Sequence, residues 1–148
     1  MLKFSVALLI IVGVGLAGSL CTPQAADQPS PLENSKMLKV VVHNNFADSE
    51  QQKGGLRNIS NILKSGEKAT IEVVCHGAGI GLVVDGQSKH SDEVANLIKQ
   101  GVRFVACENT LREKSIAKDK LLPNVETVPA GAVEVIRKQQ NGYGYFKP

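Results

Sequence analysis

One cysteine in the second half of the chain has neighbours that favour thiol chemistry. Cys107 follows the apolar run Val102–Ala106, and Asn109 can cap a helix that begins near Thr110. A helix N-terminus stabilises negative charge and lowers the pKa of a cysteine, whose thiolate is the nucleophilic form. This sulfur would be surrounded by the backbone N–H groups of Asn109 and Thr110 and by the Thr110 hydroxyl. Arg112 could add positive charge. The alternative is a small buried hydrophobe at a strand end, the usual role of free cysteine.

A histidine and a glycine-rich turn follow an earlier apolar run. The run Thr70–Cys75 leads directly into His76. This histidine could act as a base or hydrogen-bond donor at a strand end, or could only hold the turn in place. Gly77 and Gly79 allow the backbone to approach a ligand or a neighbouring chain. A dinucleotide-binding fingerprint has two residues before its last glycine, whereas only one residue separates Gly79 from Gly81. No cofactor is therefore expected.

The cysteines and histidines show no metal-binding spacing. Those at strand ends are His43, Cys75, His76 and Cys107. No C-x-x-C or H-x-x-x-H pattern connects them, so no metal site is predicted. Cys75 has apolar neighbours and is expected in the core, although in an oxidising compartment it could pair with Cys107 if their Cα atoms came within about 7 Å. His90 lies in a loop before a helix and is expected to be solvated.

Strand and helix patterns alternate after a short linker. Residues 27–37 contain prolines and serines and no apolar period, so they are predicted to be a linker ahead of one domain at 38–148. Strands are predicted at 38–42, 70–75, 102–106 and 125–128. The first helix is predicted to be capped by Asp48 or Ser49, the second by Ser91 and the third by Asn109, and the fourth is predicted to begin at Pro129. The third is a weaker pattern that begins near Thr110 and reaches Leu122. This alternation indicates an α/β fold with a mainly parallel sheet and helices on both faces.

The carboxyl ends of the strands are the expected place for function. In an open parallel sheet, ligands and catalytic groups collect at that edge. The segments that leave the strand ends are His43–Asn45, Cys75–Gly77, Cys107–Asn109 and Pro129–Gly131. Asn44, His76 and Cys107 are therefore expected along one edge of the sheet.

Two further segments indicate close packing. Gly54-Gly55 lies within a helical pattern, where glycine is unfavourable, so this pair is expected against a strand, a ligand or another subunit. The tail Tyr143–Phe146 contains both tyrosines. Such a tail is expected to dock on its own domain or on a partner subunit, because aromatic side chains are costly to leave exposed.

The N-terminus has the order of a secretory signal peptide. Lys3 precedes an apolar run from Phe4 to Leu20, and small or polar residues follow up to Ala26. This order predicts a signal peptide at 1–26 and a periplasmic domain. The alternative is an uncleaved membrane anchor, because the run reaches the lower limit of about 17 residues for a bilayer span. Membrane contact is expected only through this segment.

Composition limits the classes of function. The 148 residues are 43% hydrophobic and 21% charged, which is typical of a soluble globular domain. The net charge of +3 arises from cations scattered among acidic residues, and the chain has no tryptophan, two tyrosines and four phenylalanines. With no basic stripe and few rings to stack on bases, nucleic-acid binding is not expected.

Several segments together resemble the DsrE/DsrF-like family. They are His43-Asn44, Cys75–Gly79, Phe104–Thr110, Val128–Gly131 and Gln140–Pro148. The resemblance covers the chain from Lys39 to Pro148, and it implies a flavodoxin-like three-layer sandwich that forms a homotrimer or homohexamer. It also implies that Cys107 lies where the characterised sulfur-relay members carry persulfide sulfur.

Three classes of function remain open. The first is a periplasmic thiol or persulfide carrier, in which Cys107 takes sulfane sulfur from a donor and passes it to an acceptor protein, with His76 assisting. Such a protein would be a sulfur carrier or transferase rather than a turnover enzyme. The second is a non-catalytic protein that binds a small ligand near Asn44, Gly77 and Gly79. The third is a structural homo-oligomer whose interfaces are the glycine turn and the aromatic tail.

Overall fold

The computed structural model describes residues 37–148. The predicted signal peptide at 1–26, and the predicted linker up to residue 36, lie outside the described residues. Within 37–148, no helix combines the length and the apolar character needed to cross a membrane.

The centre of the fold is a five-stranded sheet in the order β4-β3-β2-β1-β5, with every pair parallel. The strands are β1 (Leu38–Asn44), β2 (Ala69–Cys75), β3 (Arg103–Cys107), β4 (Glu126–Val128) and β5 (Gly144–Phe146). Their β-branched residues favour extended backbone, and burial on both faces accounts for the nearly continuous apolar runs. The predicted parallel sheet is confirmed.

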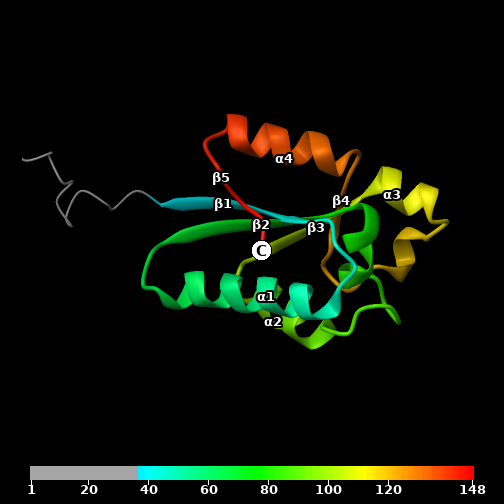
Figure 1. The fold of residues 1–148 in the computed structure, drawn as a ribbon, viewed down its shortest axis with the longest axis horizontal. Helices are drawn as coiled ribbons and strands as arrows, with labels where there is room; N and C mark the ends of the chain where they lie inside the picture. The colour runs from blue at the N-terminus through cyan, green and yellow to red at the C-terminus, as the bar shows by residue number, and fades with distance from the viewer. Residues whose placement is uncertain (1–36) are drawn as a thin grey trace, which may run out of the picture. The chain divides into compact units, whose positions relative to one another are not determined.

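Helices cover both faces of this sheet (Figure 1). The α-helices are α1 (Ser49–Lys64), α2 (Ser91–Lys99), α3 (Glu108–Glu113) and α4 (Gly131–Gln140), and the short 3-10 helices are η1 (Gly77–Val83) and η2 (Lys118–Lys120). The α1 and α2 helices lie on one face, and α4 lies on the other (Figure 1). The three-layer α/β sandwich is therefore confirmed.

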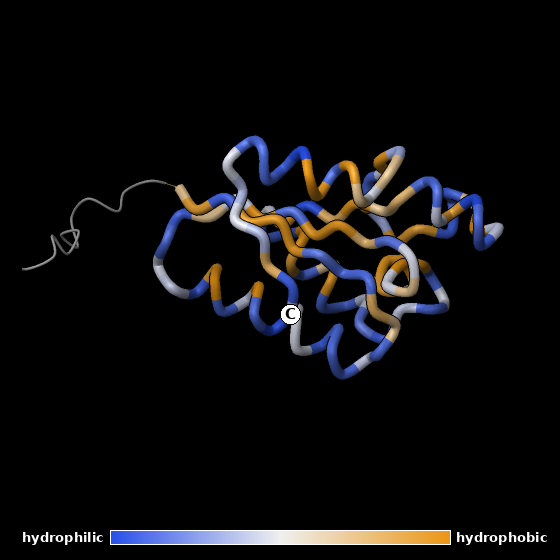
Figure 2. Tube along the Cα trace, turned by 45° about the horizontal axis from the view of Figure 1, so that its top comes forward, coloured by the Kyte–Doolittle hydropathy of each residue, from blue (hydrophilic) through white to orange (hydrophobic). Residues whose placement is uncertain are grey.

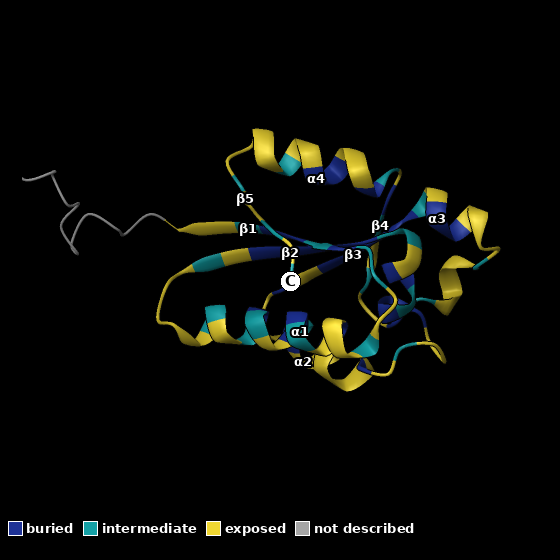
Figure 3. Ribbon diagram, viewed as in Figure 1, coloured by how far each residue is buried: buried dark blue, intermediate teal, exposed yellow. Residues whose placement is uncertain are grey.

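The core has two layers separated by the sheet. The larger layer packs Val73, Phe104 and neighbouring strand residues against α1 and α2, and the smaller one packs strand valines against Val135 of α4. Hydrophobic stretches run along the strands, while hydrophilic residues dominate the outer turns (Figure 2). The buried positions follow the same division (Figure 3).

The sheet face beneath α4 carries three rows of side chains. Alternation along each strand places every second residue on this face. The charged row is Lys39, Glu72, Arg103 and Glu126; the valine row is Val41, Val74, Val105 and Val128; and the strand-end row is His43, His76 and Cys107. These rows are staggered across the sheet, because the register pairs Val41 with Glu72, His43 with Val74 and Val105 with Glu126. Along β1, β2 and β3 the order is the same: a charged residue, then valine, then a histidine or cysteine at the strand end.

The charged row forms an ion-pair network with α4. Glu72, which is 1% exposed, places Oε2 2.6 Å from Arg103 Nη1 and 2.6 Å from Lys138 Nζ. Arg103 also donates Nε–H and Nη2–H to the two carboxylate oxygens of Glu126, at 2.9 Å and 2.6 Å. The network joins β2, β3 and β4 to α4.

Several predicted helix boundaries are wrong. The N-cap of α2 is His90 rather than Ser91, and α3 begins at Glu108 with Cys107 in the N-cap position, so Asn109 lies inside the first turn. The weak pattern up to Leu122 is not one helix, because α3 ends at Glu113 and η2 follows. Pro129 precedes the α4 helix by two residues, since α4 begins at Gly131.

His90 is buried rather than solvated, with 7% of its surface exposed. Its Nε2 lies 3.0 Å from the Ser49 hydroxyl and 2.9 Å from the Ser49 carbonyl oxygen. This histidine therefore joins the start of α1 to the start of α2.

The C-terminal tail docks on its own domain. Residues Gly144–Phe146 form β5 and pair in parallel with Val40–Val42 of β1. Pro148 then lies against α1, where a Cβ on Gly55 would come within 3.0 Å of the Pro148 Cγ atom. Gly55 thus makes room for the tail, whereas a Cβ on Gly54 would meet nothing within 4 Å.

Candidate functional site

Cys107 lies at the N-terminus of α4. Its Sγ accepts the backbone N–H of Gly131, the first residue of α4, at 3.2 Å, and only 4% of the residue is exposed. A Cβ on Gly131 would lie 3.2 Å from Cys107 Cβ and 2.9 Å from His76 Cβ. Only glycine therefore fits at this position without a shift of its neighbours. Because Gly131 lies against both side chains, Cys107 and His76 are close to each other.

The surroundings of Cys107 favour its thiolate. Burial opposes ionisation, but the N–H groups of Gly131, Thr110 and Asn109 and the Thr110 hydroxyl outweigh burial and lower the pKa of the thiol. A helix N-terminus stabilises a nearby anion in the same way. Position and electrostatics therefore both favour the thiolate of Cys107 at this edge.

His76 is hydrogen-bonded to a second histidine rather than to Cys107. Its Nε2 lies 2.5 Å from Nε2 of His43, and the two rings stack with their centroids 4.8 Å apart. The Nδ1 atom of His43 lies 2.7 Å from the hydroxyl of Tyr145 in β5. A continuous hydrogen-bonded chain thus runs from Tyr145 through His43 to His76.

Both imidazoles are harder to protonate than free histidine. Burial is the main cause that lowers the pKa of His43, with smaller contributions from His76 and Lys147. Burial and then Lys147 lower the pKa of His76. At neutral pH the pair therefore carries no charge.

This pair is expected to make stability depend on pH. The unfolded chain binds protons at these histidines more readily than the folded chain does, so their contribution is complete above about pH 6.5 and is lost as pH falls through the lowered pKa values of the folded state. Urea denaturation between about pH 7 and pH 5 should show this loss. The His43→Gln, His76→Gln double variant should show a flatter dependence, and an equal slope in both proteins would contradict the assignment.

The glycine turn is held by two polar side chains. The Gly77 N–H donates to the hydroxyl of buried Thr110 at 2.9 Å, and Gly77 has a φ of +55°, which glycine adopts most readily. Asn44 donates Nδ2–H to the Gly79 carbonyl oxygen at 2.8 Å and lies 3.6 Å from Cys75 Sγ. A Cβ on Gly79 would lie 2.4 Å from the Asn44 carbonyl oxygen, so the close approach that glycine permits is to β1.

Some predicted site residues are not brought to the sulfur. Asn44 and Cys75 point to the opposite face of the sheet, and burial raises the pKa of the Cys75 thiol to about 12. Cys75 and Cys107 are both free, so the possible disulfide between them is not formed. Arg112 is exposed and donates to the Asn109 side chain, and it is not among the groups that lower the pKa of Cys107.

Three residues of this site were not predicted as site residues. They are His43, Gly131 and Tyr145. A signal for His43 was available, because it follows Val41 by two residues just as His76 follows Val74 and Cys107 follows Val105. No comparable signal marks Tyr145, whose position depends on the pairing of β5 with β1.

The described part of the chain contains no group of three or more histidine, cysteine, aspartate or glutamate side chains arranged to hold a metal ion.

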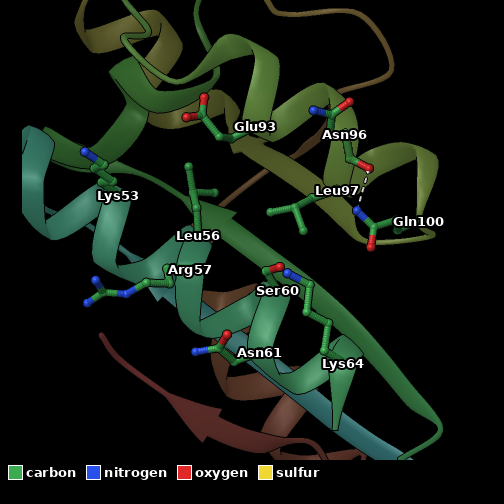
Figure 4. A pocket seen from close by; sticks show the side chains of 10 residues that line it. All are labelled: Lys53, Leu56, Arg57, Ser60, Asn61, Lys64, Glu93, Asn96, Leu97 and Gln100. Carbon is green, nitrogen blue, oxygen red and sulfur yellow. Dashed lines mark hydrogen bonds between the residues drawn. The ribbon is translucent and has the colours of Figure 1, made fainter. Parts of the chain in front are cut away.

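Two hollows lie apart from Cys107. One is a groove of about 440 Å³ between α1 and α2, with Leu56 and Leu97 among its lining residues and Lys53 and Arg57 from α1 (Figure 4). The other, of about 450 Å³, lies between the start of α1 and η1, and includes Gln52 and Ile80. None of the predicted site residues lines either one.

A profile of the DsrE/DsrF-like family matches residues 36–148. The chain belongs to this family. The match covers the whole sheet, the helices and the tail, including Cys107 and Gly131. The family is associated with sulfur relay.

Two solved structures are similar to the chain. A protein of unknown function, MTH1491 from Methanobacterium thermoautotrophicum, is 34% identical with a TM-score of 0.73, and the match covers 75% of this chain and 99% of that one. The YchN protein from E. coli is 19% identical with a TM-score of 0.61, covering 76% and 100%, and this likeness shows the fold alone. No curated protein is similar enough to count as a relative.

Proposed function

We propose that this DsrE/DsrF-like protein carries sulfane sulfur on Cys107. The thiolate of Cys107 attacks the outer sulfur of a persulfide donor, a new S–S bond forms, and the donor leaves as a thiolate. An acceptor thiolate then attacks the same outer sulfur, and Cys107 leaves as a thiolate. Atoms and charge balance in both steps, and no oxidant or reductant is needed.

The bond from the Gly131 N–H to Cys107 Sγ supports this proposal most directly. It places the sulfur at the positive end of a ten-residue helix and helps to lower its pKa despite burial. The same groups would stabilise Cys107 as nucleophile during loading and as leaving group during delivery. The second cysteine, Cys75, lacks these groups, and its raised pKa keeps it protonated.

Intact-mass analysis tests the proposal. The wild-type protein is incubated with glutathione persulfide and then with glutathione. It should gain the mass of one sulfur atom and lose it again, Cys107→Ser should gain none, and Cys75→Ser should behave as the wild type. A wild-type protein that alkylates slowly at neutral pH and gains no sulfur would refute the carrier role.

We also propose that the carrier acts in the periplasm after removal of residues 1–26. The support is the order of charge, apolar run and small residues in the sequence. N-terminal sequencing of protein recovered from the periplasm should begin near Asp27. Retention of Met1 in a membrane fraction would favour the anchored alternative.

Self-association into a trimer or hexamer is proposed through the outer face of α4. Val133 and Ile136, three positions apart on this helix, are 49% and 55% exposed. An exposed apolar pair on one helix face is typical of an interface. The Val133→Glu, Ile136→Glu variant should sediment as a smaller species than the wild type, and an unchanged sedimentation coefficient would contradict this surface.

The hollow beside η1 supports the alternative of a small-ligand binding protein. Its volume of about 450 Å³ lies in the range of ligand pockets, roughly 300–1,000 Å³, and it adjoins the glycine-rich η1. A ligand-induced thermal shift that is equal in wild type and Cys107→Ser would favour this alternative over sulfur transfer.

A further inference from the structure

The chain of hydrogen bonds at the strand ends runs from the exposed Tyr145 to His76, which neighbours the buried sulfur site across Gly131. Tyr145 is 46% exposed, whereas Cys107 is 4% exposed. Between them lie His43, which contacts the Tyr145 hydroxyl at 2.7 Å, and His76, which contacts His43 at 2.5 Å. The His76 ring lies against Gly131, the residue whose N–H holds the Cys107 sulfur.

The geometry allows two arrangements of protons in this chain. In the first, His76 Nε2–H donates to His43 Nε2, and His43 Nδ1–H donates to the Tyr145 oxygen. In the second, Tyr145 donates to His43 Nδ1, and His43 Nε2–H donates to His76 Nε2. Each arrangement satisfies every hydrogen bond, and they differ only in the direction in which protons are donated.

The two arrangements differ at the free nitrogen of His76. Its Nδ1 has no hydrogen-bond partner within residues 37–148. In the first arrangement Nδ1 is an acceptor, and in the second it carries a proton. A shift from the first arrangement to the second therefore takes up one proton at Nδ1 and releases another from Tyr145 to water.

We propose that His43 and Tyr145 are positioning residues that set the tautomer of His76 and relay protons between solvent and the sulfur on Cys107. This inference rests on the proposed carrier function. It assigns to the β5 strand a part in the site, because Tyr145 is the solvent-facing end of the relay. It also gives a reason for two histidines at neighbouring strand ends, where one would suffice as a base.

Each hop conserves protons and charge. Before loading, the Cys107 thiol gives its proton to His76 Nδ1, His76 passes its Nε2 proton to His43, and His43 passes its Nδ1 proton to Tyr145 as the tyrosine proton leaves to water. After delivery, the reverse sequence returns a proton to the Cys107 thiolate. That protonation removes the nucleophile that would otherwise recapture sulfur from the acceptor.

The charges around the relay suit this role. The titratable or charged groups recorded near the two rings are Tyr145, Lys147 and, across Gly131, Cys107. Lys147 disfavours an added positive charge, and burial acts in the same direction. A neutral pair can exchange tautomers, whereas a pair with both rings fully protonated cannot accept a proton.

Rates of sulfur loading and unloading test the relay. Glutathione persulfide is the donor, glutathione the acceptor, and intact mass follows the reaction over time. His43→Phe should slow both steps about tenfold or more; this is less than the roughly 100-fold low end of direct general acid–base effects, because His43 acts through His76. Tyr145→Phe, which removes one oxygen, should slow them in the same direction. Tyr143→Phe is the matched control, because this tail tyrosine packs near Lys138 and should leave the rates unchanged.

Nitrogen-15 NMR of the histidine rings provides a second readout, which does not depend on sulfur transfer. The wild-type rings should be neutral at about pH 7. When one ring carries its proton on Nδ1, the other should carry its proton on Nε2. Tyr145→Phe should shift the tautomer populations of both His43 and His76, although it contacts only His43. Tyr143→Phe should shift neither.

The outcomes separate the relay from the carrier function. If the wild type loads sulfur and Tyr145→Phe transfers it at the wild-type rate with unchanged tautomers, the relay is wrong and the carrier function stands. If the wild type loads no sulfur, the carrier function fails, and the relay inference, which rests on it, fails with it. Should His43→Phe not fold, the Tyr145→Phe result decides alone.

Discussion

Replacing Gly131 with alanine is expected to reduce the reactivity of Cys107 about tenfold at neutral pH, the effect of a one-unit rise in thiol pKa. The added Cβ would lie 2.9 Å from His76 Cβ and 3.2 Å from Cys107 Cβ, so the start of α4 must move away from the sulfur. That movement weakens the bond from the Gly131 N–H, which favours the thiolate. Overpacking should also lower the free energy of unfolding by roughly 1–3 kcal/mol.

Alkylation by iodoacetamide as a function of pH measures the change, and Cys75 is too buried and too weakly acidic to interfere. Gly54→Ala in α1 is the matched control, because a Cβ there meets nothing within 4 Å. It should gain up to about 1 kcal/mol of stability and leave alkylation unchanged. An alkylation profile of Gly131→Ala identical to that of the wild type would show that the helix start does not activate the sulfur.

Replacing Lys138 with methionine is expected to destabilise the protein by about 3 kcal/mol, the low end of the range for removing one partner of a buried ion pair. Glu72 is 1% exposed and loses its cation on the α4 side, while Arg103, at the same distance of 2.6 Å, remains. The low end applies because one cation is kept. Chemical denaturation monitored by circular dichroism provides the measurement.

Arg137→Met is the matched control for this experiment. Arg137 precedes Lys138 on the same helix, but its side chain is 59% exposed, and its only ion pair within residues 37–148 is with Glu134, at 3.1 Å. Exposed ion pairs contribute little to stability, so the free energy of unfolding of Arg137→Met should remain close to that of the wild type. The Glu72→Leu, Lys138→Met double variant should recover much of the loss, since a buried ion pair can often be replaced by apolar side chains. A loss equal to the sum of the single effects would rule out coupling between Glu72 and Lys138.

The parallel sheet and the position of Cys107 could be predicted from the sequence because each depends on local patterns. Valine-rich runs separated by helical periods specify a parallel α/β sheet, and a cysteine directly after such a run must lie at the carboxyl edge. His76 was found for the same reason. Family resemblance added the identity of the fold and the importance of Cys107.

The rest of the site depends on contacts between distant segments. Gly131 N–H reaches Cys107 only because α4 crosses the sheet, and Tyr145 reaches His43 only because β5 adds to β1. Neither contact leaves a local pattern. The side chains of Asn44 and Arg112 lie away from the Cys107 sulfur for a different reason. The sequence places a residue at an edge, but the pleat and the helix face decide where its side chain points.

The charged row also bears on how the chain avoids misfolding. If β2 slipped by one residue against its neighbours, Glu72 would turn into the apolar layer against α1 and α2, away from Arg103 and Lys138. Burying that carboxylate without a partner costs several kcal/mol, so a slipped pairing would be short-lived. Parallel sheets assemble slowly from distant segments and expose unpaired edges meanwhile. The network beneath α4 would therefore act during folding as a register check, rejecting misaligned intermediates that could otherwise aggregate.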